Sequence, residues 1–494
     1  MPDKIVLKKR AKAQIDWKRL FFILLGVTLF CIVYFSPDWD AAVDPRGQSF
    51  ELSHQGKAAI ALFLLAAVWW VFEVVPIGVT GMTIGVIQVL FLIRDADVAF
   101  KDFMNPSVWF IFASLSIGIA FTKTGLTQRM AYKMLYIVGE RTSMIYLGCY
   151  IMIAGLSMCM AHTAVAAAVY PLLMTINSLY DDSGKPTKFG KGLFIGMAFV
   201  AGAGSIITLL GAARGAIALG FYKETTGADI SFFTLSYYMF PIGWIMVFLL
   251  WGSFMLIYKP EKSTIPGLKE KAKRLNDKLG PLTKNEIITL ILVFSAIGLL
   301  VVRSFVPELK FLNKSAIMLV PTVFFFILKI LSVRDLENIP WNIILLFGGA
   351  MCIGFCLWQT GAANWLAVNW LTLFKDADWL VFVMGIAFLV MLMTNFIMNV
   401  AAIAIILPIA LVTGQYLGVA SEVILFSSLV TAGMPFLLLI GAAPNAIAYE
   451  SKQFTTGEFF LVGIPMSILL MIVLFVFIWI IWPVMGMNVV AGGV

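Results

Sequence analysis

The chain has 494 residues, of which 61% are hydrophobic and 13% charged, with a net charge of +8 and a mean hydropathy of +0.96. A soluble domain of this size would need far more charged surface, and many apolar runs here reach the roughly 20 residues that span a bilayer. The composition excludes a soluble or nucleic-acid-binding protein and predicts an all-α polytopic protein embedded in a lipid membrane.

The distribution of charge between the apolar runs predicts the orientation. Residues 1–19 contain seven Lys and Arg and residues 259–284 contain eight, whereas residues 36–57 contain four acidic and two basic residues. Cytoplasmic loops of membrane proteins are enriched in Lys and Arg. We therefore expect a multi-pass protein of the cell membrane with a cytoplasmic N-terminus and, after an odd number of crossings, an extracellular C-terminus.

Taken in chain order, eleven apolar segments are predicted to cross the membrane as transmembrane helices. They comprise residues 20–35, 58–75, 77–93, 107–122, 191–220, 231–258, 287–305, 315–332, 341–359, 423–450 and 459–483. Two further apolar stretches, 143–178 and 379–412, each fit two short helices but not one crossing. Basic residues precede and follow the first stretch, which predicts that it enters and leaves on one side as a re-entrant hairpin.

The order of these segments occurs twice. Residues 58–258 and residues 287–483 each contain three spans, a hairpin and two spans, and they start on opposite sides of the membrane. This inverted repeat is typical of secondary transporters, which bind their substrate near the middle of the membrane between the repeats.

Each hairpin carries a polar tip, and each is followed by a span that glycine interrupts. The tips read Ala161-His162-Thr163 and Met398-Asn399-Val400, and the breaks read Gly211-Ala212-Ala213-Arg214 and Gly441-Ala442-Ala443-Pro444-Asn445. Interrupted helices at matching places in two repeats are the best sequence indication of a substrate site. Broken helices expose N–H groups and positive dipole ends, which favour an anionic ligand.

An enzyme is not indicated. The sequence has no zinc motif, nucleotide-binding loop or intramembrane protease arrangement, and His162-Thr163 has no third, orienting acid nearby.

These residues, in this order, resemble the divalent anion/sodium symporter family, which includes the INDY-type dicarboxylate and tricarboxylate carriers. The similarity covers nearly the whole chain. Besides the two hairpin units it includes Trp69-Trp70-x-x-Glu73-x-x-Pro76-x-x-x-Thr80, Leu279-Gly280-Pro281-Leu282-Thr283 and Trp341 through Phe347-Gly348-Gly349. The resemblance implies small dicarboxylate anions as substrates and a homodimer in which a transport domain moves past a scaffold as an elevator.

On this resemblance the chain divides into scaffold, transport domain and connecting parts. Residues 1–57 form the cytoplasmic N-terminus and first helix, 58–142 and 287–378 the scaffold, 143–258 and 379–494 the transport domain, and 259–286 a basic cytoplasmic linker.

The first half departs from the family pattern. Sodium-coupled members usually carry Ser-Asn-Thr at each tip and Thr-Pro-Pro-Asn or a near variant at each break, and the second half here keeps Thr394, Asn399 and Asn445. The first half has His162 and Arg214 instead. Sodium needs oxygen ligands, whereas arginine only donates and brings its own charge. We therefore expect Arg214 to replace a bound sodium and pair with one substrate carboxylate, while His162 donates another hydrogen bond.

The predicted substrate ligands lie at the two tips and the two breaks. They are His162, Thr163, Gly211, Ala212, Arg214, Asn399, Val400, Ala442, Pro444 and Asn445. Two simpler interpretations stay open. In one, His162 only bonds a backbone carbonyl freed by the helix break; in the other, Arg214 reaches the outer end of its span and meets no substrate.

A fixed positive charge at Arg214 predicts how the carrier works. Moving an uncompensated charge through the membrane costs at least about 2.5–3.5 kcal/mol, so the empty carrier is expected to reorient rarely. This predicts sodium-independent exchange of dicarboxylates such as succinate, malate or 2-oxoglutarate, without a cofactor and with sodium not expected. The alternative is a symporter coupled to sodium through Thr394, Asn399 and Asn445, or one coupled to protons.

Overall fold

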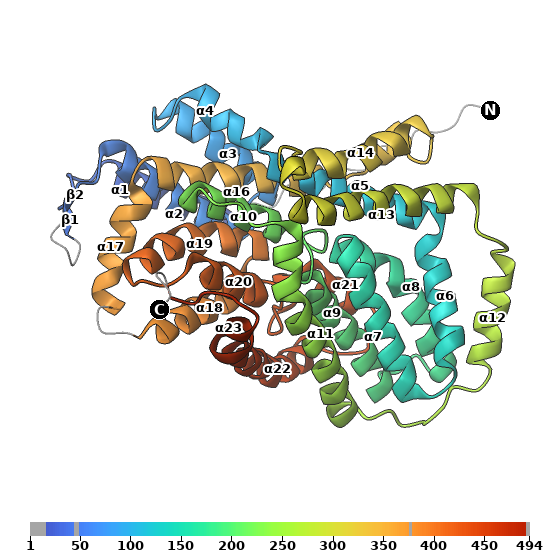
Figure 1. Cartoon of the computed structure of the whole chain (residues 1–494). Helices are drawn as coiled ribbons and strands as arrows, with labels where there is room; N and C mark the ends of the chain where they lie inside the picture. Colours follow the sequence, from blue (N-terminus) through green and yellow to red (C-terminus); the bar gives the residue numbers. More distant parts are fainter. Residues whose placement is uncertain (1–15, 44–48, 375–377, 491–494) are drawn as a thin grey trace, which may run out of the picture.

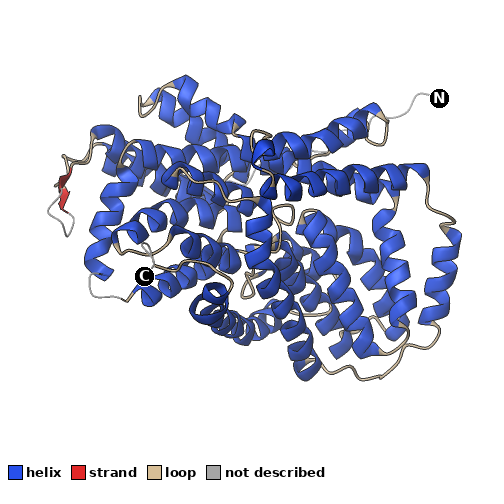
Figure 2. Cartoon of the chain, viewed as in Figure 1, coloured by secondary structure: helices blue, strands red, loops and turns tan. Residues whose placement is uncertain are grey.

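The computed structural model describes residues 16–43, 49–374 and 378–490. In these ranges the chain is almost entirely helical, with a short antiparallel strand pair, β1 (Ala42–Val43) and β2 (Ser49–Phe50) (Figure 2). Eleven helices of the described part are long and apolar enough to cross a membrane. The prediction of a helical, multi-pass membrane protein is therefore confirmed.

Helix α1 (Trp17–Tyr34) precedes the first repeat. The first repeat contains α2 (His54–Val71), α3 (Ile77–Leu90), α4 (Ala96–Lys101), η1 (Asp102–Met104), α5 (Pro106–Thr124), α6 (Leu126–Val138), α7 (Thr142–Cys159), α8 (His162–Tyr180), α9 (Lys188–Ser205), α10 (Ala213–Thr226) and α11 (Phe232–Ile257).

Helix α12 (Leu268–Lys278) links the two repeats. The second repeat contains α13 (Lys284–Phe305), η2 (Pro307–Leu309), α14 (Lys314–Ile327), α15 (Val333–Glu337), α16 (Trp341–Gln359), α17 (Ala362–Phe374), α18 (Trp379–Phe396), α19 (Asn399–Tyr416), α20 (Ser421–Ala432), η3 (Leu439–Gly441), α21 (Ala443–Tyr449), α22 (Thr456–Val476), η4 (Phe477–Ile481) and α23 (Trp482–Val484).

Both apolar stretches predicted to be hairpins fold as two helices joined by a two-residue connection. These are α7 with α8 and α18 with α19, and all four are among the eleven apolar helices of spanning length. The predicted spans 191–220 and 423–450 are each broken in the middle, into α9 and α10 and into α20 and α21. The sequence predictions missed α6, α12 and α17, because these helices lie in segments assigned to connections.

The helix contacts repeat in the two halves. Helix α7 packs against α9 as α18 packs against α20, and α8 packs against α21 as α19 packs against α10. Helices α3 and α16 pack together, as do their counterparts α14 and α5. A Cβ atom on Gly349 would lie 2.2 Å from the Cα of Gly81, so glycine at both positions lets the backbones of α3 and α16 touch. Helices α6 and α17, which precede the helix pairs of the first and second repeat and which we call arms, lie at opposite ends of the molecule (Figure 1).

Arm α6 is tied to the start of α13. Arg129 donates to Glu286 from Nε at 2.8 Å and from Nη2 at 3.1 Å, and its Nη1 donates to the Gly280 carbonyl at 2.7 Å. Glu286 also accepts from the backbone N–H of Thr283, which caps α13. The segment 279–283, which carries part of the family resemblance, therefore holds α6 in place.

The linker after α11 is held by Glu261. Its carboxylate accepts hydrogen bonds from the Lys188 backbone N–H at 2.6 Å and from the Tyr180 hydroxyl at 2.8 Å. Burial opposes ionisation of this carboxyl, but these donors outweigh it and lower the pKa of Glu261 below its usual value. Glu261 thereby joins the end of α8 to the start of α9.

Candidate functional site

A cavity of about 280 Å³ lies where the two tips meet. Helix α5, the tips at 161–164 and 398–400, the start of α10 and the residues around the start of α16 enclose it. Its lining is Ile111, Ser114, Leu115, Ile119, Ala161, His162, Thr163, Ala164, Ala167, Leu209, Ala212, Ala213, Asn338, Pro340, Ile343, Phe347, Met398, Asn399 and Val400. The structure therefore brings five predicted ligands together: His162, Thr163, Ala212, Asn399 and Val400.

His162 fixes the first tip to the first helix break. Its backbone N–H donates to the Gly211 carbonyl at 3.0 Å, and its Nδ1 lies 3.1 Å from the same oxygen. Since a carbonyl only accepts, Nδ1 carries a hydrogen, and Nε2 has no partner in the described part of the chain. His162 thus makes the backbone bond that the simpler interpretation expected and also lines the cavity.

Four helices begin at the tips and breaks without a capping side chain. These are α8 and α19 at the tips and α10 and α21 at the breaks. Their first-turn N–H groups and positive dipole ends can receive an anion. Asn399 begins α19, is 6% exposed, and its side-chain amide hydrogen-bonds to none of the described residues. Two anion-accepting ends, one from each repeat, therefore open on one cavity.

Glycine is required at the first position of each break. A Cβ atom on Gly211 would lie 2.4 Å from the Ser157 carbonyl oxygen and 2.5 Å from that of Ser205. A Cβ atom on Gly441 would lie 2.7 Å from the Thr394 carbonyl oxygen. Ser157 and Thr394 each lie five residues before their tip, so both breaks pack on the preceding hairpin in the same way. Gly211 positions the cavity through its carbonyl and does not line it.

Arg214 lies outside the cavity lining, beside the end of α9. Its side chain is buried, with 2% of the residue exposed, and Nη2 donates to Ser205 Oγ at 2.7 Å. A Cβ atom on Gly433, at the end of α20, would lie 2.7 Å from Nη2. The guanidinium therefore lies between the C-terminal ends of two half-helices, where dipoles favour a cation. This burial contradicts the interpretation that Arg214 extends to the membrane surface.

The charge of Arg214 is unpaired. No carboxylate forms an ion pair with it in the part of the chain that the structure describes, and its Nη1 has no hydrogen-bond partner there. The space beside it is about 10 Å³, the least that can hold one water molecule. Direct pairing of Arg214 with a substrate carboxylate stays a prediction.

The second break uses neutral side chains at the corresponding place. The Asn445 amide donates to the carbonyls of Pro435 at 2.9 Å and Leu438 at 3.1 Å. Thr394 Oγ1 donates to the Ala432 carbonyl at 3.3 Å. Of the predicted ligands, Ala442, Pro444 and Asn445 do not line the cavity.

Two polar residues of the cavity were missed in the sequence. Ser114 on α5 donates to the Leu210 carbonyl at 2.8 Å and so holds the first break against α5. Asn338 lies between α15 and α16 and lines the cavity from the second repeat. Among the residues that the structure describes, no acidic side chain lines the cavity.

Helices in two repeats, each broken in the middle around one shared cavity, define the architecture of a secondary transporter. The chain belongs to the family described as the sodium:sulfate symporter transmembrane region, whose match covers residues 18–488. The predicted family is confirmed, as is the expectation that the chain is a transporter and not an enzyme.

Curated relatives are similar to the chain in sequence, and solved structures are similar to it in fold. The chain is 25% identical over 505 residues to the sodium-dependent dicarboxylate transporter SdcS of Staphylococcus saprophyticus, covering 97% of this chain and 95% of that one. It is 23% identical to SdcS of Staphylococcus aureus strain MRSA252, covering 98% and 95%. The fold is similar to that of MtrF from Neisseria gonorrhoeae, of a class of antimetabolite efflux pumps, with a TM-score of 0.57, 13% identity and 94% of each chain covered. It is also similar to the YdaH transporter of Alcanivorax borkumensis, with a TM-score of 0.53, 13% identity, and 94% and 98% covered.

Proposed function

We propose that this protein is a secondary transporter of small dicarboxylate anions, which bind in the cavity between the two tips. The observation that carries the proposal is that α8 and α19 both present uncapped N-termini to one cavity, and that none of the described residues lining it is acidic. Two carboxylates on one molecule match two anion-accepting ends. The relatives named as dicarboxylate transporters support the same substrate class.

The apolar part of the cavity favours a dicarboxylate over sulfate. Leu115, Ile119, Leu209 and Phe347 contribute to its wall. Such side chains can cover the carbon chain of a four- or five-carbon dicarboxylate, whereas sulfate has no apolar part to bury.

We further propose that sodium couples transport through the second repeat. The relatives are named as sodium-dependent, which weighs against the expectation that sodium is not used. Thr394, Asn399 and Asn445 supply the neutral oxygen groups that a hard cation prefers. In the first repeat, Arg214 supplies a fixed positive charge in place of a second sodium.

Sodium-independent exchange is the second candidate function, and the unpaired charge of Arg214 favours it. An empty site with this charge resists crossing the membrane, so a counter-substrate would be needed for return. One experiment separates the candidates. Purified protein is reconstituted with or without internal succinate, and uptake of labelled succinate is measured with and without a sodium gradient. Sodium-driven uptake into empty vesicles supports symport; uptake that needs internal succinate and ignores sodium supports exchange; no uptake under any condition contradicts the substrate class.

The protonation state of His162 affects whether a substrate carboxylate can bind to its ring. Because Nδ1–H is engaged by the Gly211 carbonyl, a carboxylate can bind Nε2 only if that nitrogen or the substrate carries a further proton. We therefore propose that the apparent KM for succinate falls as the pH is lowered and that His162→Asn removes this dependence. A pH-dependence unchanged in the variant would contradict direct contact with His162.

The arrangement in the cell is also a proposal. A homodimer in the cell membrane, with a cytoplasmic N-terminus and an extracellular C-terminus, accords with the charge distribution and the family resemblance. The two helix pairs would be re-entrant, and 143–258 with 379–494 would move as an elevator against 58–142 and 287–378. A cysteine-accessibility map of both ends in intact cells tests the orientation.

A further inference from the structure

A second cavity, of about 260 Å³, lies at the other end of α10. Helices α5, α10, α13 and α14 supply most of its wall, on the face where α10 and α13 end and where α5, α11 and α14 begin. Leu209 lines both this cavity and the one between the tips. The first helix break therefore lies between the two cavities. The orientation predicted from the loop charges places the second cavity on the extracellular side.

Basic side chains outnumber acidic ones in the lining of the second cavity. Its lining contains Lys223, Arg303 and Lys314 against Glu224 and Asp229, which gives a formal charge of three minus two, or +1. Lys223 forms no ion pair within the residues that the structure describes. A positive side chain without a counter-ion is thus exposed at the mouth.

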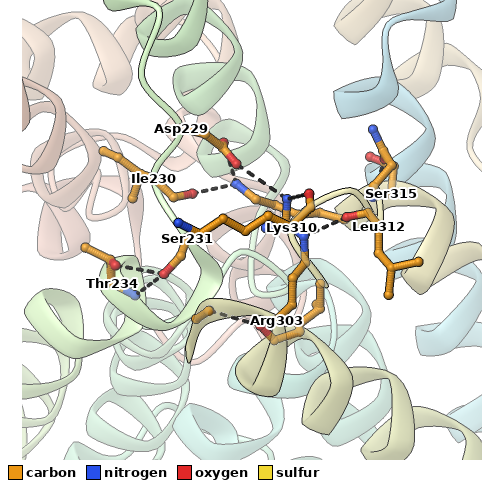
Figure 3. A network of polar contacts seen from close by, with 12 residues as sticks. Asp229, Ile230, Ser231, Thr234, Arg303, Lys310, Leu312 and Ser315 are labelled. Carbon is orange, nitrogen blue, oxygen red and sulfur yellow. Dashed lines mark hydrogen bonds and ion pairs between the residues drawn. The ribbon is translucent and has the colours of Figure 1, made fainter. Parts of the chain in front are cut away.

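The other two cations share one carboxylate, on the connection between α10 and α11 (Figure 3). Lys314 Nζ lies 2.7 Å from Asp229 Oδ1, and Arg303 Nη2 lies 3.8 Å from Asp229 Oδ2. Arg303 is otherwise held by the carbonyls of Leu312 at 2.6 Å and Lys310 at 3.0 Å, so the loop before α14 fixes its position. Asp229, which both cations contact, has 37% of its side chain open to solvent.

Two helix N-termini add to the positive potential. Helices α5 and α14 begin at this cavity, and their caps are Asn105 and Asn313, which are neutral. A neutral cap leaves the positive end of the helix dipole uncompensated, so an anion near it is stabilised. Cations and dipoles therefore favour the same kind of ligand.

We propose that the second cavity is a capture site for the dicarboxylate on the extracellular side, where the substrate replaces Asp229 on Lys314 and Arg303. The inference rests on the proposed substrate class. A substrate carboxylate makes the same contacts with Lys314 and Arg303 that the Asp229 carboxylate makes, and Lys223 receives the second carboxylate. Displacing Asp229 also removes the two ion pairs between the α10–α11 connection and helices α13 and α14, while the bond from Lys314 to the Ile230 carbonyl still holds the connection to α14.

The test compares transport from the two sides of the membrane. Initial rates are measured in right-side-out and inside-out vesicles for Lys223→Gln, Asp229→Asn and, as a matched control, Lys310→Gln, a lysine whose side chain does not line the cavity. We expect Lys223→Gln to raise the KM for external succinate about two- to five-fold, the range of an exposed charge contact. Asp229→Asn removes the competing carboxylate and should therefore lower the KM for external succinate. The KM from the inner face and the control stay at the wild-type values.

Two outcomes would overturn the proposal. If Lys223→Gln leaves the external KM unchanged while Asp229→Asn lowers Tm and slows transport equally from both faces, Asp229 is only a structural clamp. If both variants change KM equally from both faces, the site is not on the access path of one side. In either case wild-type succinate transport remains measurable, so the proposed substrate class is judged separately; it fails only if the wild type moves no dicarboxylate.

Discussion

Replacing Arg214 by methionine should stabilise the substrate-free protein and remove its response to substrate. The guanidinium is buried, forms one hydrogen bond to Ser205, and has no carboxylate partner among the described residues. Arg94 provides the contrasting case. It is also buried, but its Nη1 lies 2.8 Å from the Asp102 carboxylate.

The energies of burial and of the contacts of Arg214 decide whether Arg214→Met raises or lowers the free energy of unfolding. Burying one charge costs several kcal/mol even after relaxation. For Arg214, the charged hydrogen bond to Ser205 offsets this cost by about 1.5–3 kcal/mol. The C-terminal dipoles of α9 and α20 offset it by a further ~0.3–1 kcal/mol each, or up to ~2 kcal/mol. Replacing a buried ion pair by apolar residues of similar volume is often neutral or stabilising by about 1–4 kcal/mol. Arg214 lacks the attraction of such a partner, so we expect Arg214→Met to change the free energy of unfolding by between zero and about this amount, in the stabilising direction. Arg94→Met should instead cost about 3–5 kcal/mol, because it leaves Asp102 buried and uncompensated.

Thermal unfolding of the detergent-solubilised variants, with and without succinate, measures both effects. We expect the Tm of substrate-free Arg214→Met at or above wild type, with no rise on adding succinate, and a clear fall in Tm for Arg94→Met. A lowered Tm for Arg214→Met together with a normal succinate-induced rise would refute the reasoning. That result would mean that Arg214 is a structural residue with no part in substrate binding.

Three further changes test other parts of the structure. Gly211→Ala should destabilise by about 1–3 kcal/mol and abolish uptake, because its Cβ would meet backbone atoms of the first hairpin, whereas Gly155→Ala, with nothing within 4 Å, should behave as wild type. Arg129→Gln should cost about 3–5 kcal/mol by leaving Glu286 buried without its partner, seen as a lower Tm. Since the folded pKa of Glu261 is lowered, its stabilisation is present above the unfolded value of about 4.3 and is lost as pH falls through the folded pKa. Glu261→Gln should therefore lower Tm at pH 7 and match wild type in acid, and a constant difference across pH would contradict the assignment.

Much of the helical fold follows from the lengths of the apolar runs, whereas the orientation and the re-entrant course inferred from loop charge stay predictions. The two helix pairs and the two breaks were predictable because each has polar or small residues at its centre, around His162, Asn399, Gly211 and Gly441. Helices α6, α12 and α17 were not, because they are short helices at the rim of the molecule and lack the long apolar run that identifies a span.

The candidate site was predictable in its backbone and less so in its side chains. His162, Thr163 and Asn399, three residues singled out in the sequence, line one cavity in the structure, since the tips of two repeats meet near the pseudo-symmetry axis. Their part in substrate binding stays a prediction. The sequence pattern could not show that Arg214 turns away from that cavity toward Ser205, because a side-chain direction depends on packing between helices far apart in the sequence. The same holds for Asn338, which enters the cavity from a connection with no recognisable motif.

The two repeats share one backbone frame and differ in where positive charge comes from. Gly211 and Gly441 make the same close approach to the preceding hairpin. Arg214 donates to Ser205, the last residue of α9, and Asn445 donates to the carbonyl of Pro435, three residues after the end of α20. On the proposed function, a dicarboxylate carries two negative charges, and the positive charge of Arg214 compensates one of them. One further cation, a sodium in the second repeat or a proton on His162, makes the loaded site neutral. A loaded site crosses the membrane most easily when it is neutral, because each uncompensated charge adds to the barrier. On this proposal, the arginine lowers the number of coupling cations needed for a neutral loaded site from two to one.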